Sequence, residues 1–215
     1  MINKIVLGCT VMASLTLRGQ QDHIADDTYD THIKGNVLFA PILVFNAGIE
    51  KQIAPKMTLQ GDVFISPWKS FAKRYAQVYM VGLDARYYFT KAFDKFYVGA
   101  NISTAAFQIQ KWNYDGDNYY VSKDGETTPY LEKNLYQRGI TLLVGVVGGY
   151  QFKINDKMNM DLYLGFGSSQ ALYKGYDKIS GNRYDNIGDP RNREWNRSGE
   201  FLPYKGGLML TYKLN

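Results

Sequence analysis

Eight charged side chains lie in segments where apolar residues occupy every second position. The charged residues occupy the positions in between, which are called here the opposite parity. They are Lys34, Glu50, Asp62, Asp84, Arg86, Asp161, Lys205 and Lys213. Two carboxylates can act together as general acid and general base, but four acidic and four basic groups can also neutralise one another. We therefore interpret these residues as an internal network of ion pairs with a structural rather than a catalytic role.

The two histidines give little support to hydrolytic chemistry. Such chemistry commonly combines a histidine with a serine or a carboxylate. His23 and His32 lie at or before the first alternating segment, and no second catalytic group pairs with them by sequence. The sequence predicts that the protein is not an enzyme and needs no cofactor.

Acidic residues also gather in one polar loop, at Asp115, Asp117, Asp124 and Glu126. Calcium sites need several oxygen ligands at fixed positions, and Tyr119 occupies a ligand position of the EF-hand pattern. We therefore predict a solvated acidic loop and no metal site.

The N-terminal segment has the pattern of a secretory signal. Lys4 precedes an apolar run from Ile5 to Leu17, which is too short to span a bilayer as a helix. We expect residues 1–20 to be a signal peptide, residues 21–31 a periplasmic lead, and residues 32–215 a single domain. The only cysteine, Cys9, would leave with the signal, so disulfides and cysteine-bound zinc are not expected.

Apolar residues alternate with polar or small residues along most of the chain, which indicates β-strands. The pattern predicts eight strands, at 32–40, 43–53, 57–66, 75–90, 96–113, 138–154, 158–174 and 200–214. Short connections (54–56, 91–94, 155–157 and one near Pro41) contrast with longer polar ones (67–74, 114–137 and 175–199). The alternation slips near Ala105, which a β-bulge or the edge of a membrane would explain. Residues 118–136 are expected to form an external hairpin around Asp124–Gly125.

The placement of the charges favours a membrane barrel over a soluble one. A soluble ligand-binding barrel keeps apolar side chains inside and polar side chains outside. The side chains that alternate with the apolar ones here include eight charges, and burying unpaired charges in an apolar core has a large free-energy cost. If the apolar parity faces lipid, the charges share the interior, and pairing of the last strand with the first satisfies the backbone. We predict an all-β fold, a transmembrane up-and-down antiparallel barrel with eight strands, short periplasmic turns and longer extracellular loops. It would lie in the outer membrane of a Gram-negative bacterium, with both termini in the periplasm.

Several stretches of the chain resemble a family of small Bacteroidetes-type outer-membrane barrels of unknown function. These stretches include "HIKGNVLFAPILVFNAGIEKQI", "FISPW", "LDARYYFT", "FYVGANISTAAFQIQ", "GVVGGYQFKINDKMNMDLYLGFG" and "EFLPYKGGLMLTYKL", in this order along 32–214. The resemblance implies an eight-stranded barrel of the kind found in the membrane domain of OmpA-like proteins. Some members of this family are encoded near fimbrial genes, and the resemblance implies no reaction.

These patterns favour an accessory or structural subunit that docks to a larger cell-surface assembly, such as fibre, secretion or uptake machinery. Eight strands leave an interior only wide enough for side chains, so a plugged barrel is expected. A narrow pore and a lipid-modifying enzyme remain the alternatives. Partners would be outer-membrane lipid, lipopolysaccharide and other surface proteins; nucleic acid is not expected, because the formal net charge of +5 is spread along the chain. The candidates for partner contact are the loop residues Trp112, Tyr119, Tyr120, Arg191, Arg193 and Trp195.

Overall fold

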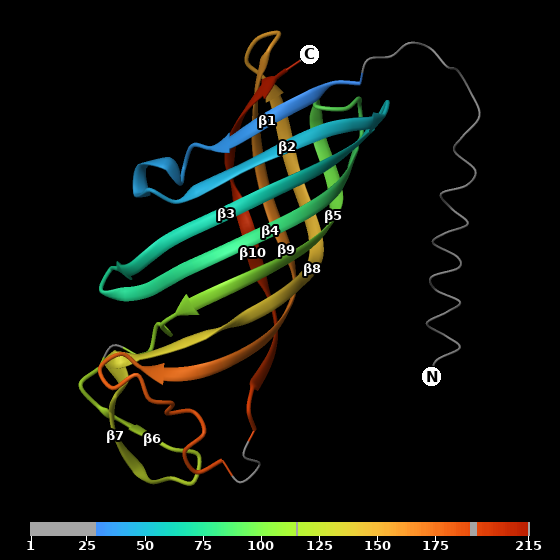
Figure 1. Cartoon of the computed structure of the whole chain (residues 1–215). Coiled ribbons are helices and arrows are strands. Elements are labelled where there is room, and N and C mark those ends of the chain that lie inside the picture. The colour runs from blue at the N-terminus through green and yellow to red at the C-terminus, as the bar shows by residue number, and fades with distance from the viewer. Residues whose placement is uncertain (1–28, 115, 190–192, 215) are drawn as a thin grey trace, which may run out of the picture.

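The computed structural model describes residues 29–114, 116–189 and 193–214 (Figure 1). The expected signal peptide and the expected lead up to residue 28 lie outside these ranges. The strands are β1 (Thr31–Asn36), β2 (Phe45–Ala54), β3 (Met57–Phe71), β4 (Arg74–Tyr88), β5 (Lys95–Ile109), β6 (Tyr119–Val121), β7 (Thr127–Leu131), β8 (Leu135–Lys153), β9 (Met158–Asp177) and β10 (Asn196–Lys213). Two 3-10 turns, η1 (Ala40–Ile42) and η2 (Glu132–Asn134), complete the described elements.

Eight of the strands form one closed antiparallel barrel, in the order β1-β10-β9-β8-β5-β4-β3-β2. The ring closes where β1 pairs with β10, from His32 opposite Lys213 to Asn36 opposite Met209. The predicted all-β, antiparallel, eight-stranded architecture is confirmed. No helix in the described part of the chain combines the length and apolarity needed to cross a membrane.

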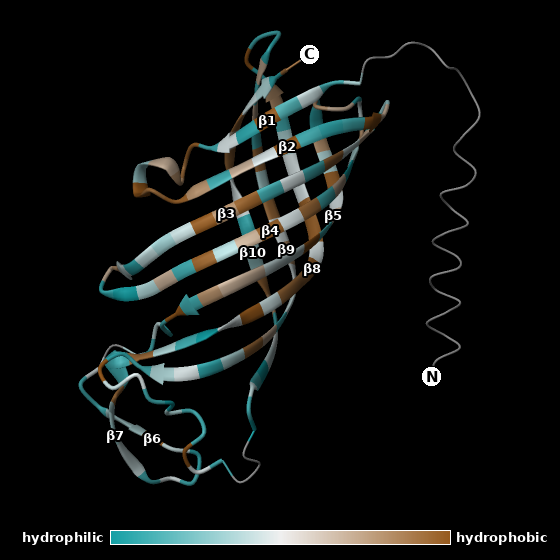
Figure 2. Cartoon of the chain, in the orientation of Figure 1, coloured by the Kyte–Doolittle hydropathy of each residue, from teal (hydrophilic) through white to brown (hydrophobic). Residues whose placement is uncertain are grey.

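Side-chain exposure alternates along the strands as the sequence predicts. On β4, Val81 and Leu83 are 53% and 54% exposed, whereas Asp84 and Arg86 are 0% exposed. Figure 2 shows apolar positions recurring along the strands of the barrel. Because successive strand residues point to opposite faces, the wall is apolar outside while its polar parity fills the interior.

Two connections at one end of the barrel differ from expectation. The predicted loop 67–74 is wrong, because β3 and β4 continue to a two-residue turn at Ala72 and Lys73. Both turn residues have positive φ, 48° and 65°, the backbone geometry that matches the twist of paired strands. The connection near Pro41 is longer than expected, because β1 ends at Asn36 and residues 37–44 contain η1.

Of the two explanations offered for the slip near Ala105, the β-bulge is wrong. The pairing of β4 with β5 runs without a shift from Ala76 opposite Ile109 to Tyr88 opposite Tyr97. The alternation slips there because apolar side chains line the inside at this level, where Met80, Ala105 and Leu143 form a buried cluster. A register shift occurs instead in β10, between Pro203 and Lys205.

The predicted hairpin over 118–136 is present as β6 and β7 and belongs to a cluster of loop residues, here called the cap, at the loop ends of β8 and β9 (Figure 1). Tyr114, Leu135 and Tyr184 form the buried centre of this cap, and Tyr120 and Tyr130 pack against it. The rings of Tyr120 and Tyr184 meet edge to face at 4.8 Å. The two longest connections, 110–134 and 178–195, therefore pack on each other through tyrosines.

Candidate functional site

Arg86 is the centre of an ion-pair network inside the barrel. Its guanidinium donates to Asp84 at 2.8 Å, to Asp161 at 3.0 Å and to Glu50 at 3.3 Å. Asp84 belongs to the same strand, Glu50 to β2 and Asp161 to β9. All four side chains are 0% exposed, so this cluster ties strands from three places in the ring together.

Two lysines extend the network toward opposite sides. Lys34 of β1 pairs with Asp161 at 2.8 Å and also with Glu50. Lys205 of β10 pairs with Asp62 at 2.7 Å and with Asp84 at 3.0 Å. The structure thus brings together seven of the eight charged residues singled out in the sequence.

The eighth residue, Lys213, is not part of the network. It pairs with Asp30 at 2.7 Å, and both side chains are about one-third exposed. Lys213 lies opposite His32 in the last pair of β10 with β1, which places its side chain at the mouth of the barrel. Including Lys213 in the interior network is therefore wrong, because correct parity does not fix depth along the strand.

The interior network contains one more carboxylate than it has cations. Glu50, Asp62, Asp84 and Asp161 face Lys34, Arg86 and Lys205, which leaves a formal charge of −1. Hydroxyl and amide donors surround the excess: Tyr88 donates to Glu50 at 2.8 Å, Tyr97 donates to Asp161 at 2.9 Å, and Thr58 and Asn101 donate to Glu50 and Asp84. Hydrogen bonds to the charged form stabilise buried carboxylates.

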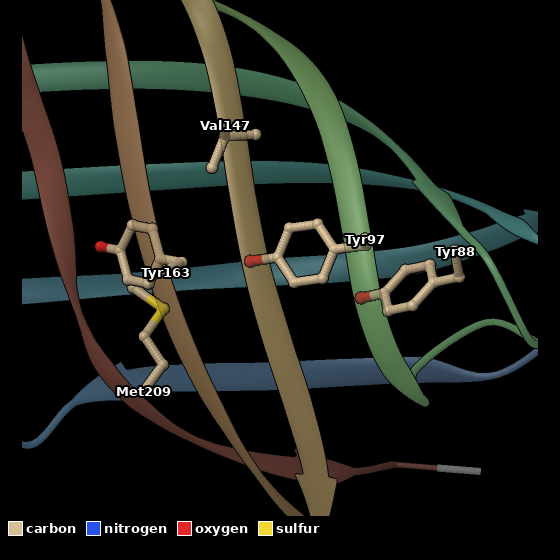
Figure 3. Close-up of a cluster of buried hydrophobic side chains, with 5 residues drawn as sticks. All are labelled: Tyr88, Tyr97, Val147, Tyr163 and Met209. Atoms are coloured by element: carbon tan, nitrogen blue, oxygen red, sulfur yellow. The ribbon is translucent and has the colours of Figure 1, made fainter.

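Tyrosines form a layer beside these charges. Figure 3 shows Tyr88 and Tyr97 side by side with their hydroxyl groups pointing the same way, near Val147, Tyr163 and Met209. The two rings are 5.0 Å apart, and the guanidinium of Arg86 lies 4.6 Å from the ring centre of Tyr97. The period-two alternation of β4 and β5 directs both tyrosines inward, but it carries no signal that they would donate hydrogen bonds to the carboxylates.

Small residues on facing strands make room for these large side chains. A Cβ atom at Gly149 would lie 2.5 Å from the hydroxyl oxygen of Tyr97, and one at Gly165 would lie 2.5 Å from Cγ of Lys205. Tyr97 and Gly149 are cross-strand partners on β5 and β8. Glycine is therefore required at these positions by close packing.

Phe93, in the turn between β4 and β5, covers the interior at the short-turn end. Its ring stacks on His32 with the centroids 3.9 Å apart and the planes 7° from parallel. His32 is 3% exposed, and its Nδ1 lies 3.4 Å from Oγ1 of Thr211. His32, at the start of the first strand, is therefore buried rather than solvated, because this apolar turn residue folds inward over it.

The chemistry open to this arrangement is limited. Each carboxylate of the network already binds a cation, and each cation contacts at least one carboxylate. Within the described ranges, no group of three or more His, Cys, Asp or Glu side chains could hold a metal ion. At the level of this network the interior is filled by paired side chains.

The loop residues chosen as partner contacts divide into two groups. Trp112, Tyr119 and Trp195 are exposed, with Trp112 76% exposed and beside Arg74. Arg193 is also exposed and pairs with Asp189 at 3.3 Å. Tyr120 is half-buried in the cap, so it supports the loop rather than presenting a surface, and Arg191 lies outside the described residues.

The chain matches a family model over nearly its whole length. A family model described as "Protein of unknown function (DUF3575)" matches residues 5–214, which include every strand of the barrel. No curated protein and no solved structure matches the chain.

Proposed function

This chain belongs to the DUF3575 family, whose function is unknown, and we propose that it is a non-enzymatic outer-membrane barrel that docks to a larger cell-surface assembly. The proposed architecture is that of the membrane domain of OmpA-like proteins. The observation that carries the proposal is the inverted polarity of the barrel, with paired charges inside and an apolar wall outside. Such a wall is stable where the surrounding medium is hydrocarbon.

The apolar outer surface includes residues from the whole ring. Ile49, Leu59, Val81, Ile102, Val144, Leu162 and Tyr212 are among its exposed members. Soluble monomers rarely expose contiguous apolar patches of more than a few hundred Å², and lipid is the medium that would cover all sides of a barrel at once. A transmembrane strand needs about 9–11 residues, and most strands of the ring meet or exceed that length.

The docking role is supported by a filled interior and a structured loop surface. Trp112 and Trp195 are exposed beside the cations Arg74 and Lys174, at 4.7 and 4.3 Å. Tryptophan and arginine are the residue types most enriched where binding energy is concentrated in protein interfaces. Together with the tyrosine cap, these residues offer a rigid surface for a partner such as fibre, secretion or uptake machinery.

The direct test is fractionation followed by co-purification from detergent-solubilised membranes. The protein should be recovered in the outer-membrane fraction together with other surface proteins. A Trp112→Ala/Trp195→Ala variant should lose these partners, whereas Ile179→Ala, which truncates an even more exposed loop side chain, should retain them. Recovery of the wild-type protein always alone would count against docking, and recovery in the soluble fraction would overturn the membrane location.

A narrow pore is separated from this proposal by a second measurement. The buried network, with Phe93 over one end, blocks the lumen in its short-turn half. We expect no ion conductance from the purified protein in planar bilayers. Reproducible channel currents that change on Arg86→Ala would establish the pore instead.

A further inference from the structure

One edge of β10 has no neighbouring strand over its loop-side half. β10 pairs with β9 from Asn196 to Tyr212, but β1 pairs with β10 only as far as Met209, apart from one bond from the amide of Val37 to the carbonyl of Leu208. Among the described residues, 196–207 therefore have a strand on one side only. In Figure 1, β10 continues toward the loop end after β1 has ended.

A cavity of about 420 Å³ passes over this free edge. Its lining includes Leu164, Pro203 and Gly206 from the outward parity of the wall, and Phe64, Met80 and Lys205 from the inward parity. Phe39 and Phe64 meet edge to face at 5.6 Å on the side opposite β10. The cavity thus joins the outer surface to the inside of the barrel through the wall.

The register shift between Pro203 and Lys205 shapes this opening. It leaves Tyr204 and Lys205, two consecutive residues, directed inward: Tyr204 donates to Oδ1 of Asn101 at 2.6 Å and Lys205 to Asp62 at 2.7 Å. Proline has no N–H to offer to another strand and is typical of free edges and bulges. The edge is therefore poorly suited to pairing with a strand from another protein.

The polarity of the cavity selects its occupant. The cluster at its inner side is apolar, with Met80, Ala105 and Leu143 packed by Phe64, Val78 and Tyr204. The charged residues Asp62 and Lys205 pair with each other, so neither presents a free charge. At the outer side, Leu164 is 61% exposed and the rings of Phe166 and Phe201 pack with their centroids 4.4 Å apart. The apolar outer wall therefore continues up to the opening of the cavity.

We propose that this side opening binds one acyl chain of a membrane lipid, which enters with its methyl end first. The chain contacts Phe64, Met80 and Tyr204, while the headgroup stays outside because the cavity has no free charge to bind it. The volume is within the range of small-molecule sites, and eight-stranded barrels can hold one small ligand. The inference rests on the proposed membrane location, since the cavity opens onto the apolar outer wall, which is in contact with lipid only if the barrel spans a membrane.

The experiment uses two phospholipid probes in vesicles that contain the full-length protein. One probe carries a photoreactive diazirine near the methyl end of its acyl chain, and the other carries it near the carboxyl end. The methyl-end probe should label peptides that contain Phe64, Met80 or Tyr204, at a saturable ratio of one per chain. The carboxyl-end probe should label only outward residues. A free fatty acid with the methyl-end diazirine, used in a third sample, distinguishes a free acid from an intact lipid as the source.

A pair of variants on β4 provides the matched control. Val78→Trp adds bulk on the inner side and should abolish interior labelling, whereas Val81→Trp adds the same bulk on the outer wall, where Val81 is 53% exposed, and should leave it unchanged. The mapping in the wild-type protein gives a result even if Val78→Trp does not fold. Labelling of outward residues alone by both lipid probes, in a membrane-inserted protein, would overturn the acyl-chain site. Recovery of the protein outside the membrane would instead overturn the proposed location.

Discussion

Replacement of Arg86 by alanine removes the centre of the interior network. The change deletes the donors to Asp84, Asp161 and Glu50 and raises the formal charge imbalance of the network from −1 to −2. The remaining cations, Lys34 and Lys205, would have to neutralise four buried carboxylates. We therefore expect Arg86→Ala to destabilise the folded barrel strongly.

The size of the effect follows from the burial of all partners. Removing one member of a buried ion pair costs about 3–5 kcal/mol, because it leaves an uncompensated charge. For a domain of this size, each kcal/mol lowers Tm by about 2–4 °C, so the expected decrease is about 6–20 °C. The assay is the temperature at which the folded band converts to the unfolded band on SDS gels. Arg138→Ala, on the exposed face of β8, is the matched control and should change the free energy of unfolding by less than about 0.5 kcal/mol.

A second substitution separates lost charge from lost packing. Arg86→Ala/Asp161→Asn returns the charge of the network to −1 while keeping an acceptor for Tyr97, and it should recover part of the lost Tm. Arg86→Lys should be intermediate, because lysine keeps the charge but not the planar donor geometry. If Arg86→Ala melts at the same temperature as Arg138→Ala, the carboxylates are hydrated in the lumen and the argument for a dry, filled interior fails.

Three further changes test other parts of the structure. Phe93→Ala should lower the free energy of unfolding by about 3–5 kcal/mol, as for other buried aromatic truncations, and a smaller loss in the same gel assay would mean that the turn does not seal the short-turn end. Gly149→Ala should cost about 1–3 kcal/mol through overpacking against Tyr97, whereas Gly35→Ala, with no atom within 4 Å of the added Cβ, should be nearly neutral; equal effects would contradict the packing argument. Burial raises the pKa of Tyr184, so its contribution to the cap is complete below the unfolded pKa of about 10 and is lost as pH rises. Phenolate absorbance should therefore show a late alkaline step that is absent in Tyr184→Phe, together with increased proteolysis of the hairpin.

Which side chains face the inside of the barrel and which face the outside could be predicted from the sequence, because this depends on a local property. Each residue of a strand points to the face opposite its neighbour, so a period of two identifies the inside and outside of every strand without knowledge of pairing. Arg86 and Asp84 were placed inside by this rule alone, and both are fully buried. The same rule directs the apolar Val81 and Leu83 outward, and both are more than half exposed.

Positions along the barrel axis could not be predicted in the same way, since they depend on pairing between strands far apart in the chain. Lys213 has the inward parity but lies at the short-turn end of the barrel, where its partner is Asp30. The bulge at Tyr204 follows from the register of β10 on β9, and the inward fold of Phe93 follows from a turn with positive φ. The depth of Lys213 and the inward fold of Phe93 leave the hydrophobic period unchanged, so the sequence pattern carries no signal for them. The bulge reverses the outward parity of β10, between Phe201 and Tyr212, which are both exposed, but the period alone does not say at which residue the reversal falls.

The two halves of the interior differ in a way that explains where the wall can open. The ion pairs around Arg86 need complete enclosure, because a buried charge exposed to hydrocarbon without its partners is costly. That half is enclosed by paired strands, including the β1–β10 seam, and by Phe93 at the turn. The free edge of β10 instead borders the layer of Met80, Ala105 and Leu143 and the ion pair of Asp62 with Lys205, where contact with an acyl chain exposes no unpaired charge. The early end of β1 at Asn36 therefore falls where an opening is tolerated. The same opening one or two layers of side chains closer to Arg86 would destabilise the network.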